Sequence, residues 1–113
     1  MPIPPIIVCE APAVIDGDTI RCANLRASVR LIGIDAPELH RCPKTRTCTP
    51  GEGRAAKRAL VQLLALGTVT IRPAGDGGYG RIAARVWAGR VDVNCQMIRT
   101  GHAVRRYRPL RCQ

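Results

Sequence analysis

The amino-acid sequence predicts a mainly β (α+β) fold: a five-stranded antiparallel barrel of the OB type with two helices. Its 113 residues are enough for one domain around a single modest core. Five short runs rich in β-branched residues are separated by turn signals. A helical pattern lies between the third and the fourth run, which is the order of elements in such a barrel. No repeat or composition shift divides the chain, so we expect one domain over residues 1–113.

The predicted strands are short, and Gly, Pro or Asn follows each of them. The first is expected to bend at residues 9–12, and Asp16-Gly17 predicts a tight turn into the second. Because the first three strands follow one another closely, we expect an antiparallel meander. Pro73 ends the fourth strand, and four glycines within residues 74–80 predict a flexible turn. The runs are 6–8 with 13–15, 19–22, 29–34, 68–72 and 82–87.

Two segments have the apolar spacing of helices. Residues 54–66 place alanine and leucine on one face and basic side chains on the other, and Gly67 supplies the stop. We interpret the basic face as a solvated surface rather than a substrate-binding one. Residues 91–101 fit a second helix, which Gly101 ends.

The composition favours a polyanionic partner. The chain has 18 Lys and Arg against 8 Asp and Glu, a net charge of +10. Nucleic acid, DNA or RNA, is the first candidate for such a partner, and an anionic membrane surface is the second. No apolar stretch is long enough to span a bilayer, so we expect no membrane insertion. With no Phe and only three other aromatic residues, the core must be aliphatic.

Six cysteines in so short a chain indicate an oxidising compartment. Six cysteines allow 15 pairings, so the connectivity stays open. A zinc site is the competing interpretation, although no Cys-x-x-Cys pair exists and His40 and His102 stand apart. The pairs that sequence proximity favours are Cys42–Cys48, Cys9–Cys22 and Cys95–Cys112.

The expected location is secreted or periplasmic. Residues 1–5 lack the charged start and long apolar middle of a signal peptide. We therefore expect that the signal has been trimmed from this chain. Residues 39–50 have no periodicity and predict a loop that is long enough to suspect a function.

Charged residues concentrate at the ends of predicted strands. Residues 30–38, Arg-Leu-Ile-Gly-Ile-Asp-Ala-Pro-Glu, begin with an arginine and close on two carboxylates. Asp16-Gly17-Asp18 occupies the first turn, and Tyr79-Gly80-Arg81 follows the glycine-rich turn. Carboxylates gathered at one mouth need a hard cation such as Ca²⁺ or Mg²⁺, and the arginines need a second anion. A phosphodiester meets both needs, so the charges predict a metal-assisted phosphodiesterase.

Three motifs together resemble the staphylococcal nuclease (thermonuclease) family: residues 14–19, residues 30–38 and Tyr79-Gly80-Arg81. Val93-Asn94 and Gly101-His102-Ala103 also resemble the family pattern, and the similarity covers about residues 7–107. The resemblance implies an OB-fold, Ca²⁺-dependent nuclease that cuts DNA and RNA with little sequence preference.

The resemblance also implies roles for individual residues. Asp18 and Asp35 match the metal carboxylates, and Ala36 would add its backbone carbonyl to a Ca²⁺ site, with Mg²⁺ the lesser choice. Glu38 matches the residue that activates the attacking water, whereas Asp16 reads as a turn residue rather than a ligand. The arginines that would bind and stabilise the phosphate are Arg30 and Arg81. The residues that would contact the substrate are Tyr79, Tyr107 and Lys44.

The chain departs from the family pattern in several places. Ala36 stands where Thr is common, and Gly77-Gly78 replaces a more polar approach to Tyr79. The sequence stops near Cys112, where the founding enzyme continues into a third helix, so that helix is expected to be shortened or absent. The cysteine framework is this chain's own feature.

Two other classes of protein compete with a monomeric nuclease. A non-catalytic OB-fold module that binds single strands would have little use for all five charged positions, and three aromatics make a poor stacking platform. A cationic, cysteine-stapled toxin would not need these charges at these places.

Overall fold

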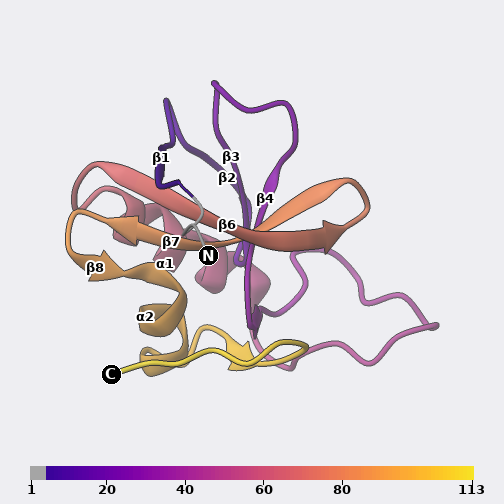
Figure 1. The fold of residues 1–113 in the computed structure, drawn as a ribbon. Coiled ribbons are helices and arrows are strands. Elements are labelled where there is room, and N and C mark those ends of the chain that lie inside the picture. The colour runs from indigo at the N-terminus through magenta and orange to yellow at the C-terminus, as the bar shows by residue number, and fades with distance from the viewer. Residues whose placement is uncertain (1–4) are drawn as a thin grey trace.

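The structure, a computed structural model, describes residues 5–113. The residues on which the signal-peptide interpretation rests, 1–5, lie outside the described part of the chain, except for Pro5. Residues 5–113 form nine strands and two helices (Figure 1). The elements are β1 (Ile7–Val8), β2 (Ala13–Asp16), β3 (Thr19–Arg21), β4 (Val29–Leu31), β5 (Ile34–Asp35), α1 (Gly53–Leu64), β6 (Val69–Gly78), β7 (Arg81–Ala88), β8 (Val91–Asp92), α2 (Val93–Arg99) and β9 (Val104–Arg105).

One seven-stranded sheet forms the body of the molecule and curls into a half-barrel (Figure 1). Its strand order is β1-β6-β7-β4-β3-β2, and β8 pairs with β7. The long hairpin β6–β7 runs from Val69 opposite Ala88 to Gly78 opposite Arg81. The curled sheet with two helices confirms the predicted mainly β fold and is consistent with the OB type.

The pairing of β4 with β7 corrects one part of the prediction. These strands run parallel, with Val29 opposite Ile82 and Arg30 opposite Ala83, so the sheet is not antiparallel throughout. A parallel pair needs a long crossover connection, and here α1 and β6 supply it. Local sequence patterns carry no signal for such a distant pairing. The ladder brings Arg30 within two register positions of Arg81.

Two of the predicted strands are each divided in the structure. Residues 6–15 form β1, which pairs with β6, and β2, which pairs with β3. Residues 29–34 form β4 and the start of β5, because Gly33 between them has a φ of 79°, which favours glycine. A Cβ at Gly33 would lie 2.7 Å from the Cβ of Leu110. β5 then leaves the main sheet and pairs with β9, a strand that no sequence pattern predicts.

Residues 74–78 are strand rather than the flexible turn that their glycines predict. They form the second half of β6, whose register shifts between Pro73 and Asp76 and again between Asp76 and Gly78. The glycines allow these register shifts, because Gly75 has a φ of 126° and Gly78 a φ of 79°, values that other residues rarely adopt. The turn is thus confined to residues 79–80.

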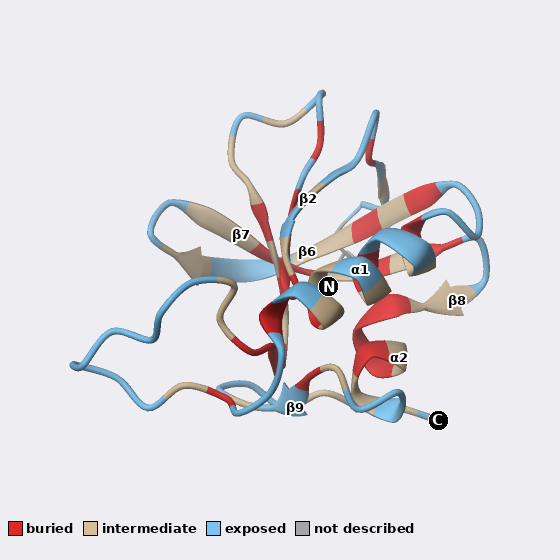
Figure 2. Cartoon of the chain, turned by 180° about the vertical axis from the view of Figure 1, so that it is seen from behind, coloured by how far each residue is buried: buried red, intermediate tan, exposed pale blue. Residues whose placement is uncertain are grey.

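Helix α1 covers one face of the curled sheet (Figure 2). It begins at Gly53, one residue earlier than predicted, and ends at Leu64, two residues earlier than predicted. Glu52 is the N-cap, and its carboxylate accepts a hydrogen bond from the backbone N–H of Arg54. The apolar face, including the fully buried Leu60, packs into the core, and the basic face remains at the surface.

Helix α2 begins at Val93, two residues later than predicted, because residues 91–92 form β8. Asp92 caps the helix, and its side chain accepts a hydrogen bond from the N–H of Cys95. Neither helix of residues 5–113 is long and apolar enough to cross a bilayer.

Asn94 ties α2 to the sheet. Its side chain is fully buried and accepts a hydrogen bond from the N–H of Val86 at 2.9 Å. Its amide also donates to the carbonyl oxygens of Ile32 and Ala84. A buried side chain with all three contacts made fixes the turn between β4 and β5 against β7.

The core is aliphatic, as predicted. Its largest fully buried hydrophobic side chains are Ile20, Leu31, Ile34, Leu60, Ile71, Met97, Val29, Val86 and Val93.

Three disulfides join the pairs that sequence proximity favours. No cysteine of the described residues is free, so none is available as a zinc ligand. The bridges are Cys9–Cys22, Cys42–Cys48 and Cys95–Cys112. Three bridges are typical of an oxidising compartment.

Candidate active site

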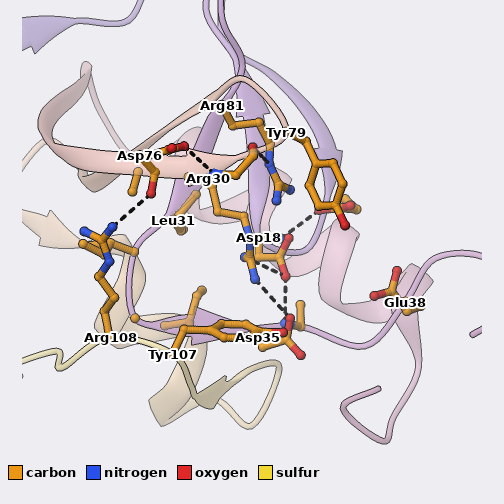
Figure 3. A pocket seen from close by; sticks show the side chains of 18 of the residues that line it. Asp18, Arg30, Leu31, Asp35, Glu38, Asp76, Tyr79, Arg81, Tyr107 and Arg108 are labelled. Carbon is orange, nitrogen blue, oxygen red and sulfur yellow. Dashed lines mark hydrogen bonds and ion pairs between the residues drawn. The ribbon is translucent and has the colours of Figure 1, made fainter. Parts of the chain in front are cut away.

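One cavity of about 450 Å³ brings the three charged motifs together (Figure 3). It lies between the first turn, the β4–β5 segment, the β6–β7 turn and the chain after β9. Lys44 does not line this cavity, although it lies in the loop beside it. The predicted site residues that do line it are Asp18, Arg30, Asp35, Ala36, Glu38, Tyr79, Arg81 and Tyr107.

Gly17 allows the first turn to approach the end of β5. A Cβ at this position would lie 2.7 Å from the Cβ atoms of both Ala36 and Ala56, so no larger residue fits without displacement. The close approach lets the N–H of Ala36 donate a hydrogen bond to Asp18 Oδ2 at 2.9 Å. Asp16 completes the turn, since its Oδ1 accepts a hydrogen bond from the N–H of Asp18.

Asp18 is buried, and its surroundings disfavour its charge. Burial raises its pKa to about 7 from 3.8, and the neighbouring Asp16 adds to the rise. Arg30 and the N–H of Ala36 act in the opposite direction without cancelling the effect. The side chain also accepts a hydrogen bond from the Thr19 hydroxyl. A further positive charge nearby would therefore stabilise the ionised form of this carboxyl group.

Arg30 lies between the two buried carboxylates. Its Nη1 is 2.9 Å from Asp18 Oδ2, an ion pair without hydrogen-bond geometry, and its Nη2 donates to Asp35 Oδ1 at 3.1 Å. Only 12% of the Arg30 side chain is exposed. Its position is thus set by the protein before any ligand arrives.

Asp35 is 1% exposed and is surrounded by donors. Besides Arg30, its Oδ2 accepts hydrogen bonds from the Thr49 hydroxyl at 2.7 Å and from Arg106 Nη1 at 3.0 Å. Arg106 also donates to the carbonyl oxygen of Thr47 in the long loop. Asp35 therefore joins β5, the long loop and β9 at one point.

Glu38 follows Pro37 at the rim of the cavity. Arg46 reaches it from the long loop, with Nη1 3.1 Å from Glu38 Oε1. Another nitrogen of Arg46 lies 3.8 Å from Asp35 Oδ1 and donates to the Tyr107 hydroxyl at 3.4 Å. Partial burial lowers the pKa of Arg46, but Glu38 and its other neighbours raise it overall. Arg46 thus contributes a fixed positive charge beside Glu38.

Tyr79 and Arg81 face the carboxylates from the β6–β7 turn (Figure 3). Arg81 Nε donates to the carbonyl oxygen of Gly78 at 2.9 Å, and its terminal nitrogens have no hydrogen-bond partner among residues 5–113. The Arg81 guanidinium lies 5.5 Å from the ring centroid of Tyr79, a cation–π contact. Tyr79 itself is 98% exposed and has a φ of 54°.

Tyr107 forms the opposite wall. Its ring centroid lies 5.8 Å from the guanidinium of Arg30 and 4.9 Å from that of Arg106. Tyr107 is 66% exposed, so a ligand in the cavity can contact it.

Comparison with known proteins identifies the family of this chain. The model of the family described as "Staphylococcal nuclease homologue" matches residues 28–112.

The chain belongs to the staphylococcal nuclease family.

Two curated relatives agree with this membership, and both are named "Uncharacterized endonuclease". The relative from Haemophilus influenzae is 30% identical over 98 residues, which are 84% of this chain and 50% of that protein. The relative from Escherichia coli is 37% identical over 93 residues, which are 80% of this chain and 55% of that protein. The chain thus spans about half the length of the curated relatives that it matches.

Three residues that contact the buried Asp35 carboxylate are not predicted from the sequence. They are Arg46, which lines the cavity, and Thr49 and Arg106, which lie behind it. Residues 39–50 have no periodicity that would show where Arg46 and Thr49 point. In the sequence, only the position of Arg106 next to Tyr107, a predicted substrate contact, points to a role for Arg106 at the site.

The donor set of this nuclease-family cavity suits a hard divalent cation. Asp18 and Asp35 supply carboxylate oxygens, which Ca²⁺ and Mg²⁺ prefer, and burial raises the pKa of Asp18, so a bound cation would favour its ionised form. Residues 5–113 hold no cluster of three or more His, Cys, Asp or Glu side chains that could bind a metal ion. Backbone, water or substrate oxygens, with the carbonyl of Ala36 first, would therefore complete such a site.

Proposed function

We propose that this protein is a nuclease that hydrolyses phosphodiester bonds of DNA or RNA with little sequence preference. The observation that carries the proposal is the convergence of two buried carboxylates, two arginines and a rim carboxylate on one cavity. Membership of the staphylococcal nuclease family supports it. The net charge of +10 favours a polyanionic substrate.

The proposed metal ligands are Asp18, Asp35 and the backbone carbonyl of Ala36, with Ca²⁺ the expected ion. When bound, the cation would withdraw electron density from a phosphate oxygen and stabilise the charge that develops on it. The protein contacts each of the two carboxylates from three sides: Asp18 through Ala36, Thr19 and Arg30, and Asp35 through Arg30, Thr49 and Arg106. The anchoring keeps their geometry fixed before substrate binds.

Glu38 is the proposed general base. Its carboxylate stands at the rim, with 31% of the side chain exposed, so a water molecule can reach it. It would take a proton from the water that attacks phosphorus, and the ion pair with Arg46 holds its side chain in place at the rim.

Arg30 and Arg81 are proposed to bind the phosphate from two sides. Arg30 is held by the carboxylates, and Arg81 approaches from the opposite turn. Guanidinium groups match phosphate oxygens in forked geometry, and a pentacoordinate phosphorus carries more charge than the ground state. Both arginines would therefore favour the transition state over the bound substrate, with Arg81 nearer the leaving oxygen.

The proposed setting is extracytoplasmic and monomeric. All the proposed groups come from one chain, so a second copy is not needed to complete the cavity. The three disulfides favour secretion or a periplasmic location, which implies a signal sequence that is removed. We propose single-stranded nucleic acid as the substrate, because unpaired bases can stack on the exposed rings of Tyr79 and Tyr107 at the cavity.

Cleavage of labelled single-stranded DNA, in Ca²⁺ and in excess chelator, tests the proposal. We expect cleavage in Ca²⁺ and none in chelator. Replacing Glu38→Gln or Arg81→Gln should slow cleavage at least ~10²-fold, which is typical for the loss of one preorganised charged group. Glu10→Gln, an exposed carboxylate outside the cavity, is the control and should keep full activity.

The same experiment separates the nuclease from a non-catalytic strand-binding module. A protein that binds the DNA without cutting it in Ca²⁺ would be such a module. Full activity of Glu38→Gln would refute the assignment of the base, and undiminished cleavage in chelator would refute the metal.

A further inference from the structure

A second cavity lies at the other end of β7 from the candidate active site. Its volume is about 660 Å³, and β7, β8, α2 and the C-terminal tail form its walls. In Figure 1 these elements gather on the side of the molecule away from the long loop. The lining residues are Arg85, Trp87, Arg90, Val91, Asp92, Gln96, Arg99, Arg111 and Gln113.

The second cavity is strongly cationic. Four of its nine lining residues are arginines, and Asp92 is the one acidic residue among them. Asp92 is already neutralised, because it forms an ion pair with Arg85. None of the ion pairs of the described residues involves the other three arginines, which are exposed: Arg90, Arg99 and Arg111. Like charges gathered in this way repel one another, and a polyanion would relieve that repulsion.

Planar side chains stand beside these charges. The guanidinium of Arg72 lies 5.5 Å from the ring centroid of Trp87, and that of Arg85 lies 5.9 Å from it. Arg72 pairs with Arg85 across the β6–β7 ladder, so the three side chains share one surface. The Nε of Arg72 is buried without a hydrogen-bond partner among the described residues. Bases stack on tryptophan rings and on guanidinium planes, which a bare polyanion cannot do.

The C-terminal tail connects this surface to the candidate active site. Arg108 lines the first cavity and donates hydrogen bonds to the carbonyl oxygens of Ala74 and Asp76 in β6. Three residues later, the carbonyl oxygen of Arg111 accepts a hydrogen bond from Arg85 in the second cavity. The Cys95–Cys112 disulfide holds the tail at this place.

We propose that the second cavity binds the part of a single-stranded nucleic acid that extends beyond the cleavage site. The surface, here called the flanking-strand site, comprises Arg72, Arg85, Trp87, Arg90, Arg99 and Arg111. The proposal rests on the proposed nuclease function, because the strand it holds is the one that the first cavity cuts. It predicts a substrate-length requirement that the active site alone would not impose.

The distance from Arg81 to Trp87 sets that length. Trp87 lies six positions after Arg81 along β7, which is about 20 Å of strand. At about 3.4 Å per nucleotide in a stacked strand, about six nucleotides cover this distance. A dinucleotide therefore reaches one site only, whereas a strand of about twelve nucleotides reaches both.

Trp87 offers a direct readout, because it is the chain's one tryptophan. In excess chelator, so that no strand is cut, the intact protein is titrated with a single-stranded DNA of about twelve nucleotides. We expect the fluorescence of Trp87 to change on binding. A dinucleotide bound at the first cavity should leave it unchanged.

A charge-matched pair of variants tests the arginines. Arg90→Gln/Arg111→Gln removes two exposed cations whose side chains make no hydrogen bond or ion pair among the described residues, so folding should be preserved. Arg21→Gln/Arg26→Gln removes two cations outside both cavities. We expect the first variant to weaken binding of the long strand at least ~10-fold and to make the salt dependence shallower, by about 0.7 in slope for each phosphate left unneutralised. The second should change both little.

Cleavage separates the two proposals. In Ca²⁺, Arg90→Gln/Arg111→Gln should raise KM for the long strand and leave cleavage of a dinucleotide phosphodiester unchanged. Equal losses in both double variants, or tight strand binding with unchanged Trp87 fluorescence, would overturn the flanking-strand site while leaving the nuclease proposal intact. An equal fluorescence response to inorganic polyphosphate would show a general polyanion site instead and overturn the assignment to nucleic acid.

Discussion

Among single residues, Asp18 links the candidate active site to the stability of the fold. Its pKa rises to about 7 from 3.8, chiefly because burial disfavours the charged form. The folded state therefore holds this proton more tightly than the unfolded state does. The resulting stability is fully present below about pH 4 and is lost as the pH rises through about 7.

Asp18→Asn should remove this pH dependence. In excess chelator, the free energy of unfolding of the wild type should fall between pH 4 and pH 7, relative to that of the variant, by as much as ~1.4 kcal/mol per pH unit. Denaturant titrations at several pH values measure the difference. Glu10→Gln should follow the wild type. Parallel curves for the wild type and Asp18→Asn would show that burial does not govern this carboxyl group.

The predictability of the site also divides residue by residue. Asp18, Arg30, Asp35 and Arg81 could be placed because each is a charged residue in or beside an apolar run, which is visible in the sequence. Arg46 comes from a loop without periodicity, so no pattern distinguishes it from Lys44. Its contacts with Glu38 and Asp35 depend on how the loop folds back, which only tertiary structure shows.

Among the elements, the break between β4 and β5 aims the carboxylates at the cavity. Gly33 permits the break, because its φ of 79° is strained for other residues and its Cα faces Leu110 closely. Gly101 has almost the same φ, 78°, but a Cβ there would meet nothing within 4 Å. Alanine would therefore cause backbone strain at both glycines, but a steric clash only at Gly33.

Gly33→Ala should destabilise the fold more than Gly101→Ala does. Each variant carries the cost of a left-handed alanine, roughly 1–2 kcal/mol, and Gly33→Ala must in addition displace Leu110 from a 2.7 Å approach. Denaturant midpoints at a fixed pH measure both. Equal losses would mean that the tail moves freely away from Gly33.

The disulfide-closed loop is the second element with a testable role. Cys42 and Cys48 are six residues apart, and Arg46 lies between them. Closing so short a loop stabilises the fold by about 2 kcal/mol at most in the chain-entropy view. The larger effect of the bridge should be to hold Arg46 beside Glu38.

A double-mutant cycle measures that effect. Cys42→Ser/Cys48→Ser and Arg46→Gln should each lower kcat/KM at least ~10-fold, and the combined variant should lose little more, because both changes remove the same positioned charge. Cys9→Ser/Cys22→Ser is the control, since it opens a bridge far from Arg46, and Arg46→Gln should keep its full effect there. Additive losses in the first cycle would place the loop bridge and Arg46 in separate roles.

At the scale of the whole molecule, local patterns predict the elements better than their pairing. The amphipathic spacing of α1 and the β-branched runs are local, and the structure has both. The glycines of residues 74–78 predict a turn because Gly and Pro usually end strands, yet the ladder with β7 holds this segment in β6. The division of the first strand between β6 and β3 likewise depends on partners distant in sequence.

The parallel ladder between β4 and β7 has a consequence for how the protein matures. It joins Val29 to Ile82, residues more than fifty positions apart, and it carries Arg30 toward Arg81. Contacts between distant segments form late, because closing the loop between them costs conformational entropy before the contacts contribute any stabilisation. A growing or partly folded chain would thus hold its carboxylates without their second arginine, and cutting ability would arise only as the last long-range contacts close.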